Sequence, residues 1–260
     1  MMIGANTVKA FRLFLIPAAL ACVTGAALAQ DEAAPGDIEV PEPPKWERSL
    51  DFGLSGASGN TDTQDIYAAF NAHKATEQAT IDFIATYRKS QNDGQDTSNR
   101  FFTQGRYTWI FEDSKWGLFA GGTFELDRFQ IWDQRISAHV GPSYRFIDND
   151  KTFLDARLGV GVVGTYGGGG RDDMTDPEAI LAASFRHKFN DKLSLAANAD
   201  LLPNLEDTSE FRFLGDLGVE YSLAESWALK VGIQEVYDSN PGAGFKKSDF
   251  YYFAALSVKF

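Results

Sequence analysis

The sequence has little cysteine, few basic residues for its length and, after its first thirty residues, no long apolar run. Its single cysteine, Cys22, has no partner for a disulfide. Lys and Arg number 24 against 36 Asp and Glu, which makes the surface a poor partner for nucleic acid. Nothing after residue 30 approaches the ~20 apolar residues that a membrane helix needs. These absences exclude disulfide chemistry, nucleic-acid binding and helical membrane insertion.

The first 29 residues have the pattern of an export signal. Lys9 and Arg12 precede an apolar stretch over residues 13–23, and the small-x-small sequence Ala-Leu-Ala ends at Ala29. This pattern predicts a signal peptide cleaved after Ala29. Cys22 would be removed with it, and the residues before Cys22 make a poor lipobox. Without Lys9 and Arg12, 22 basic residues face 36 acidic ones, a net charge of −14.

Residues 30–45 are acidic and rich in proline and show no periodicity. Such composition is typical of a linker. We expect a disordered periplasmic tether here, because Pro41, Pro43 and Pro44 disfavour an edge strand or a plug element.

From Trp46 onward, apolar and polar residues alternate in segments of about 10 to 14 residues, as in strands that cross a membrane obliquely. The clearest segment runs from Gln134 to Ile147. One face carries Ile136, Ala138, Val140, Pro142, Tyr144 and Phe146, and the other carries Arg135, Ser137, His139, Gly141, Ser143 and Arg145. Similar segments begin near Trp46, Gln64, Ala79, Asn99, Trp116, Thr152, Pro177, Lys192, Ser209, Trp227 and Asp249. The pattern therefore predicts twelve strands over residues 46–260.

The connections between these segments alternate in length. Those after the even-numbered strands are short: ATEQ, EDSK, DNDK, ND and LAES. The others are mostly longer, including SQNDGQDTS, the GGGGRDDMTD stretch from Gly167, LPNLEDT and DSNPGAGFKKS. Short periplasmic turns and longer extracellular loops are typical of an antiparallel up-and-down transmembrane β-barrel. We therefore predict an all-β fold of this kind with about twelve strands.

The last strand ends in Phe260, with Phe250, Tyr252, Ala254, Leu256 and Val258 on the same face. A terminal Phe on an apolar period-two strand is typical of bacterial outer-membrane barrels. It predicts a Gram-negative outer-membrane location and recognition of the C-terminal strand by the barrel-assembly machinery. The expected surroundings are outer-membrane lipids and lipopolysaccharide. The sequence does not determine the oligomeric state.

Aromatic residues gather at the predicted strand ends. Trp46, Trp116 and Trp227 begin strands on the periplasmic side, and Trp109 ends one there. With Phe260 they are predicted to form an aromatic girdle at the membrane interface. A soluble barrel, whose apolar face points inward, predicts no such clustering.

The face opposite the apolar one is predicted to line the lumen. Its charged candidates are Arg135, His139, Arg145, Asp155, Arg157, Arg186, Asp200, Arg212, Asp216, Glu220 and Lys230. The two signs nearly balance over the whole inner face, so the count gives no ion selectivity. Counting from turn centres places four pairs at facing positions: Asp127 with Arg135, Arg145 with Asp155, Asp200 with Arg212 and Glu220 with Lys230. These charges can stitch the inner wall together or line a path for solutes.

Catalytic, cofactor and metal sites are not predicted. His73 and His139 stand alone on separate strands, which favours hydrogen bonding in the lumen over metal binding or catalysis. The Gly167–Gly170 run lacks the Lys-Ser/Thr of a phosphate loop. The loop that follows is predicted to be acidic, with Arg171, Asp172, Asp173, Asp176 and Glu178. Solvation is its simplest role, and bridging of divalent cations or lipopolysaccharide is the alternative.

Several segments resemble the salt-stress-induced outer-membrane proteins, a proteobacterial family otherwise described as a domain of unknown function. They are the run YDSNP from Tyr237, the Lys246-Lys247 pair followed by Asp249, and the final Lys259-Phe260. WERSLDFGLSGASGNTDTQ from Trp46 and ELDRFQIWDQRISAHVGPSYRFI, with Asp133, Arg135 and Gly141, are similar too. The resemblance covers nearly all of residues 46–260. It implies expression under salt stress and brings no catalytic or binding residues.

We therefore predict a non-enzymatic outer-membrane barrel. It would be a narrow diffusion channel for small solutes or a structural protein of the envelope under osmotic stress. One alternative is a barrel enzyme of the phospholipase or protease kind. Another is an adhesion or binding barrel that acts through its acidic extracellular loops.

Overall fold

Twelve β-strands make up the described part of the chain. The structure is a computed structural model that describes residues 45–58, 63–92, 95–168 and 173–260. The strands are β1 (Glu47–Ser58), β2 (Thr63–Ala75), β3 (Ala79–Asn92), β4 (Gln95–Ile110), β5 (Trp116–Asp127), β6 (Gln134–Asp148), β7 (Thr152–Tyr166), β8 (Met174–Lys188), β9 (Leu193–Pro203), β10 (Phe211–Ala224), β11 (Trp227–Asp238) and β12 (Ser248–Lys259).

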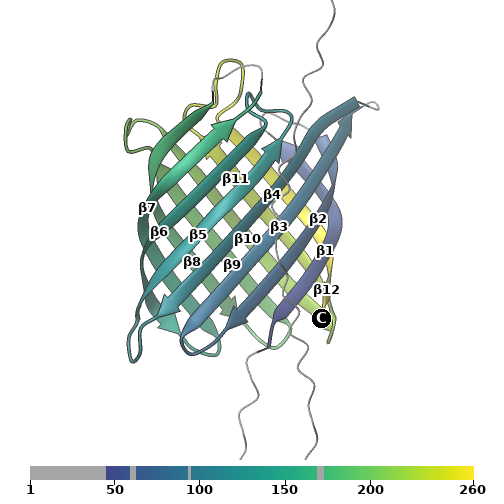
Figure 1. Cartoon of the computed structure of the whole chain (residues 1–260). Coiled ribbons are helices and arrows are strands. Elements are labelled where there is room, and N and C mark those ends of the chain that lie inside the picture. Colours follow the sequence, from purple (N-terminus) through teal and green to yellow (C-terminus); the bar gives the residue numbers. More distant parts are fainter. Residues whose placement is uncertain (1–44, 59–62, 93–94, 169–172) are drawn as a thin grey trace, which may run out of the picture. The chain divides into compact units, whose positions relative to one another are not determined.

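The strands close into one antiparallel barrel (Figure 1). Each strand pairs with its neighbours in the sequence, and β1 pairs with β12 from Ser49–Lys259 to Ser58–Phe250. The prediction of a twelve-stranded up-and-down barrel is confirmed. Closure leaves no edge strand, so every strand finds hydrogen-bond partners on both sides.

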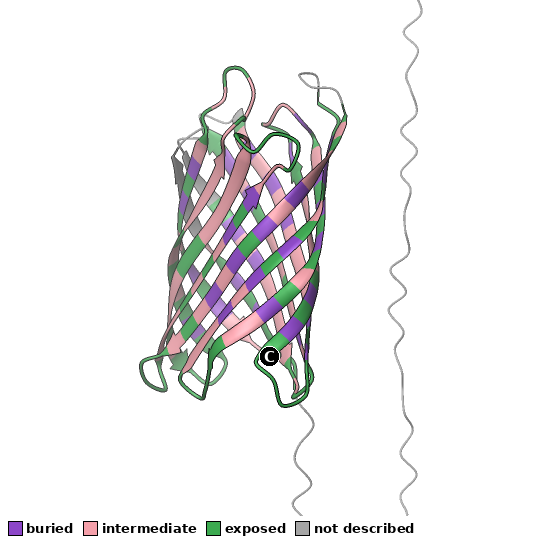
Figure 2. Cartoon of the chain, turned by 90° about the vertical axis from the view of Figure 1, so that its left-hand side faces the viewer, coloured by how far each residue is buried: buried purple, intermediate pink, exposed green. Residues whose placement is uncertain are grey.

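Side chains alternate between the outside and the inside of the barrel along each strand. On β7, Leu158, Val160 and Val162 are exposed on the outside, whereas Asp155 and Arg157 are buried within. Figure 2 shows the same alternation as bands of buried and exposed residues along neighbouring strands. The outer belt is thus made of exposed aliphatic and aromatic side chains. Such a surface matches the hydrocarbon core of a bilayer and not water.

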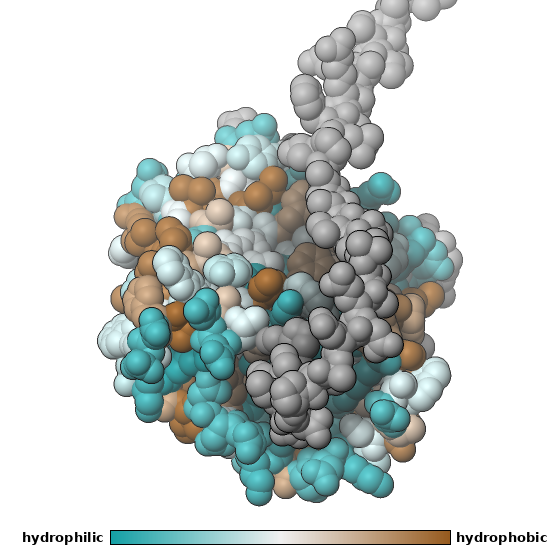
Figure 3. Space-filling view, turned by 60° about the horizontal axis from the view of Figure 1, so that its bottom comes forward, coloured by the Kyte–Doolittle hydropathy of each residue, from teal (hydrophilic) through white to brown (hydrophobic). Residues whose placement is uncertain are grey.

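The two ends of the barrel differ. The end that carries Trp46, Phe260 and the short connections after even-numbered strands is called the turn end, and the other is the loop end. In two of the short turns an Asn side chain holds the backbone: Asn149 Oδ1 accepts hydrogen bonds from the amides of Lys151 and Thr152, and Asn190 Oδ1 does so from Lys192 and Leu193. Hydrophilic residues gather along much of the rim at the turn end (Figure 3).

Two predicted connections are shorter than expected. β3 runs to Asn92 and β4 begins at Gln95, four residues before the predicted start, so most of SQNDGQDTS belongs to strands. β8 likewise begins at Met174 and not at Pro177. The prediction was wrong because polar residues at the end of a hairpin still pair: Ser90 faces Ser98, although both read as turn residues.

The predicted signal peptide over residues 1–29, its cleavage after Ala29 and nearly all of the predicted tether over residues 30–45 lie outside the described residues. In the described segments, no helix is long and apolar enough to cross a membrane.

Candidate functional site

The inner wall of the barrel is the candidate site, because its polar and charged side chains converge on an enclosed space. Near the turn end, Lys230 on β11 lies 3.0 Å from Asp51 on β1 and 3.5 Å from Glu220 on β10. Lys259 on β12 forms an ion pair with the same Glu220. Glu220 and Lys230 are also register partners, as predicted. This group, called the seam cluster, joins four strands around the closure of the barrel.

A second group centres on Arg157 of β7. Its guanidinium donates hydrogen bonds to Asp155 at 2.7 Å and to Ser184 Oγ at 3.1 Å. Asp200 on β9 lies 3.8 Å away from the same guanidinium. Arg157 and Asp155 are both buried, so each charge depends on the other for compensation.

A third group lies toward the loop end. Glu178 on β8, 2% exposed, is 2.8 Å from His139 Nε2 and accepts hydrogen bonds from Arg212 on β10, the shortest at 2.7 Å. Arg135 on β6 donates to Asp238 on β11 at 3.1 Å. Glu178 thus gives the imidazole of the inward-facing His139 a hydrogen-bond partner, and neither a metal ion nor a substrate is needed for that role.

Several contacts cross the lumen between strands that are not neighbours. Arg88 on β3 donates to Gln234 on β11 at 2.6 Å, and its guanidinium lies 4.5 Å from the Tyr251 ring. Gln104 on β4 donates to Asp200 on β9 at 3.2 Å. The Arg135–Asp238 pair likewise joins β6 to β11. Such links hold opposite walls together.

A small apolar cluster stands among the polar side chains of the lumen. Phe119 on β5, 3% exposed, packs with Ile180, Ala182 and Leu202, and Leu214 lies against the cluster. Gly159 leaves the room that Phe119 needs, since a Cβ there would lie 2.9 Å from the Phe119 ring. Asp200 is the register partner of both Ala182 and Leu214, so the Gln104–Asp200 bridge adjoins this apolar cluster. The apolar cluster and the bridges from Gln104 and Arg88 are together called the septum.

Beside the septum the inner wall of β9 and β10 is open to water. Ala196, Asn198 and Asp216 occupy inward positions and yet are exposed. Asn198 donates a hydrogen bond to Asp216 at 3.0 Å. Asn198 lies one inward position nearer the turn end than Asp200, and Asp216 one nearer than Leu214. The open space therefore begins beside the septum, where Asp216 also faces Gln234 in register.

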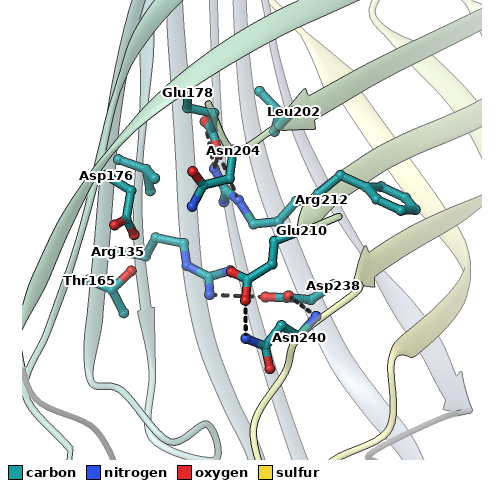
Figure 4. A pocket seen from close by; sticks show the side chains of 12 residues that line it. Arg135, Thr165, Asp176, Glu178, Leu202, Asn204, Glu210, Arg212, Asp238 and Asn240 are labelled. Atoms are coloured by element: carbon teal, nitrogen blue, oxygen red, sulfur yellow. Dashed lines mark hydrogen bonds and ion pairs between the residues drawn. The ribbon is translucent and has the colours of Figure 1, made fainter. Parts of the chain in front are cut away.

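At the loop end, two cavities of about 50 and 30 Å³ share Arg135 and Asp238 as lining residues. Figure 4 shows the larger, where the carboxylates of Asp176, Glu178, Glu210 and Asp238 converge with Arg135 and Arg212. Leu202 of the septum also lines this cavity. Trp132, 4% exposed, lines the smaller one and stacks with the Arg135 guanidinium at 4.5 Å.

Two of the four predicted facing pairs are wrong, and the other two, Arg145 with Asp155 and Glu220 with Lys230, are confirmed as register partners. Arg135 faces Glu125 and not Asp127, and Arg212 faces Leu202 and not Asp200, because the true registers differ by two residues. Arg145 and Asp155 do face each other, but their ion pairs are with Asp148 and Arg157. Arg186, also inward on β8, lies 4.5 Å over the Phe153 ring near the turn end.

The predicted interface aromatics all lie exposed at the turn end. They are Trp46, Trp109, Trp116, Trp227 and Phe260. Arg48 lies over the Phe260 ring at 5.1 Å and Lys74 over the Trp46 ring at 5.8 Å. Long basic side chains beside aromatic rings suit the boundary between lipid and water.

Sequence reasoning missed the septum. Phe119, Ile180, Leu202 and Leu214 stand at inward positions of strands whose other inward residues are mostly polar or small. That break in the alternation was the available signal. Among the described residues, no group of three or more His, Cys, Asp or Glu side chains could hold a metal ion.

The family match covers residues 50–260, most of the chain. The chain belongs to the family described as "Protein of unknown function, DUF481". The resemblance noted in the sequence is therefore confirmed for the family of unknown function, and salt-stress induction stays a prediction. No curated protein matches the sequence.

Among solved structures, a NanC porin matches with a TM-score of 0.54 and 12% identity, over 81% of this chain and all of that one. At this identity the likeness establishes a shared barrel fold. An outer membrane channel, COG4313 from Pseudomonas putida F1, has a TM-score of 0.49 and 13% identity, over 88% of this chain and all of that one.

Proposed function

We propose that this DUF481 protein is a non-enzymatic outer-membrane channel for small solutes, narrowed by the septum. The observation that carries the proposal is the exposure of inward-facing Asn198 and Asp216, deep within the barrel wall. Above them, Leu202 belongs both to the septum and to the lining of the larger loop-end cavity. Water-accessible space thus approaches the septum from both sides.

The septum also favours a second function, a closed barrel that supports the envelope. Its bridges link β3 to β11 and β4 to β9, and its apolar cluster buries Phe119. An apolar constriction opposes ion passage by excluding water. A barrel closed in this way would stiffen the outer membrane without conducting.

Planar-bilayer recording of the purified full-length protein separates the two functions. We expect discrete conductance steps from the wild type, and larger steps from Phe119→Ala because the aromatic ring of the apolar cluster is removed. Phe124→Ala is the matched control, since Phe124 lies on the same strand, on the outer face, against Phe101.

Conductance in Phe119→Ala but not in the wild type would assign the closed, structural role. Silence in both would refute the channel. The enzyme alternative is addressed by incubating the protein with phospholipids, lipopolysaccharide and peptides, where we expect no products.

We also propose that production of the protein rises with external salt, on the strength of the family resemblance alone. Quantitative immunoblotting of cells shifted to high salt checks this. A constant amount of protein would contradict it.

A further inference from the structure

Asp216 is an inward-facing carboxylate with no basic partner in the described part of the chain. The described residues give its side chain one contact, the 3.0 Å hydrogen bond donated by Asn198 Nδ2. An amide does not neutralise a carboxylate, so the negative charge of Asp216 faces the water of the lumen. We propose that the pore prefers small cations and that Asp216 sets this preference. The inference rests on the proposed channel function.

Nearby inward carboxylates differ from Asp216 because basic side chains compensate them. Lys230 lies 3.0 Å from Asp51 and 3.5 Å from Glu220, and Arg157 lies 3.8 Å from Asp200. The inner face as a whole has nearly equal numbers of positive and negative side chains. A count of charges therefore does not show which carboxylates have a basic neighbour. Basic side chains thus lie beside Asp51, Glu220 and Asp200, whereas no ion pair of Asp216 occurs among the described residues.

The position of Asp216 lets its charge act on ions that pass through the lumen. It lies one inward position nearer the turn end than Leu214 and faces Gln234 of the Arg88 bridge in register, so an ion that passes the septum passes close to it. Solvent screens charges there less than at an open surface. Arg186 and Lys188 are basic, inward and exposed, but they end β8 at the turn end. Charges at that rim are screened by salt within about 10 Å at 0.1 M. Arg186 and Lys188 therefore weaken the preference for cations less than Asp216 strengthens it.

The loop end carries negative charge as well. Four carboxylates and two guanidinium groups line the larger cavity, which leaves it with a charge of −2 when all are ionised (Figure 4). A cation that approaches from this end therefore meets an attractive potential before it reaches the septum. The loop-end cavity and Asp216 favour the same sign of ion.

Reversal potentials in a KCl gradient test the inference with the full-length protein in planar bilayers. We expect the wild type to pass K⁺ in preference to Cl⁻. Asp216→Asn should lower the ratio of K⁺ to Cl⁻ permeability at least about fivefold, since one unit charge at ~4 Å in water changes the local concentration of each ion by about that factor. Asp216→Glu should keep the ratio, and Asp216→Lys should invert the preference.

The matched control is Asp191→Asn, which removes the same charge from the short turn between β8 and β9 and should leave the ratio unchanged. An unchanged ratio in Asp216→Asn, or an anion preference of the wild type, overturns the inference and leaves the channel function standing. Absence of conductance in both the wild type and Phe119→Ala overturns the channel and this inference together.

Discussion

Arg157 illustrates why individual ion pairs in the lumen could not be read from the sequence. Its partner Asp155 lies two residues away on the same strand, and its other partners, Ser184 and Asp200, come from two further strands. Facing positions on neighbouring strands predicted a different partner for Asp155, namely Arg145. Long side chains in a lumen reach along and across the wall, so register alone does not determine pairing.

A double-mutant cycle at the residue scale distinguishes the two partners. We expect Asp155→Ala and Arg157→Ala to be coupled by at least about 1 kcal/mol in the free energy of unfolding, because they are in contact. Each single change should cost about 3 kcal/mol, since it leaves a buried charge without its partner. Urea unfolding in lipid vesicles, followed by tryptophan fluorescence, measures both quantities.

Arg145→Ala with Asp155→Ala is the matched comparison. Arg145 pairs with Asp148, so these changes should be additive within about 0.5 kcal/mol although the two residues face each other. Strong coupling here, together with additivity for Asp155 and Arg157, would contradict the observed pairing.

At the scale of elements, the period-two alternation predicted every strand, because one face of each strand must be apolar for lipid. Strand ends were less certain where the sheet extends beyond the apolar belt. There the β3–β4 hairpin continues with residues such as Ser98, which face no lipid and carry no alternating signal. Local sequence could not separate such paired ends from a loop.

The closure between β1 and β12 gives a prediction of its own. A Cβ on Gly53 would overlap the carbonyl oxygen of Ala254 on β12, whereas a Cβ on Gly218 would find its nearest atom at 3.9 Å. Gly53→Ala should therefore lower the free energy of unfolding by about 1–3 kcal/mol through overpacking. Gly218→Ala should change it by no more than about 0.5 kcal/mol. Equal urea midpoints for the two variants would contradict this account of the closure.

For the whole molecule, the tryptophans report how the barrel sits in a membrane. Trp116 is exposed at the turn end, and Trp132 is buried at the loop end among residues of the lumen. In variants that keep one tryptophan each, lipids brominated near the headgroup should quench Trp116 fluorescence strongly and Trp132 fluorescence little. Comparable quenching of both would mean that Trp132 faces lipid.

The sequence predicted the barrel and its two surfaces, but not the state of the lumen. Whether a lumen is open depends on how far side chains such as Phe119 and Arg88 reach from walls that are distant in the chain. That distance follows from barrel diameter and shear, which no single segment encodes. The contacts that form the septum could therefore be recognised only in the complete barrel.

The seam cluster has a consequence for biogenesis. Asp51 lies on β1 and Lys230 on β11, and the two side chains come into contact only when β12 has paired with β1. In a sheet that has not closed, Asp51 lacks the ammonium group of Lys230, whereas Lys230 keeps its neighbour Glu220 on β10. Attraction between Asp51 and Lys230 favours the closed barrel over the open sheet. The Asp51–Lys230 pair therefore stabilises the closure of the cylinder itself and not any single hairpin.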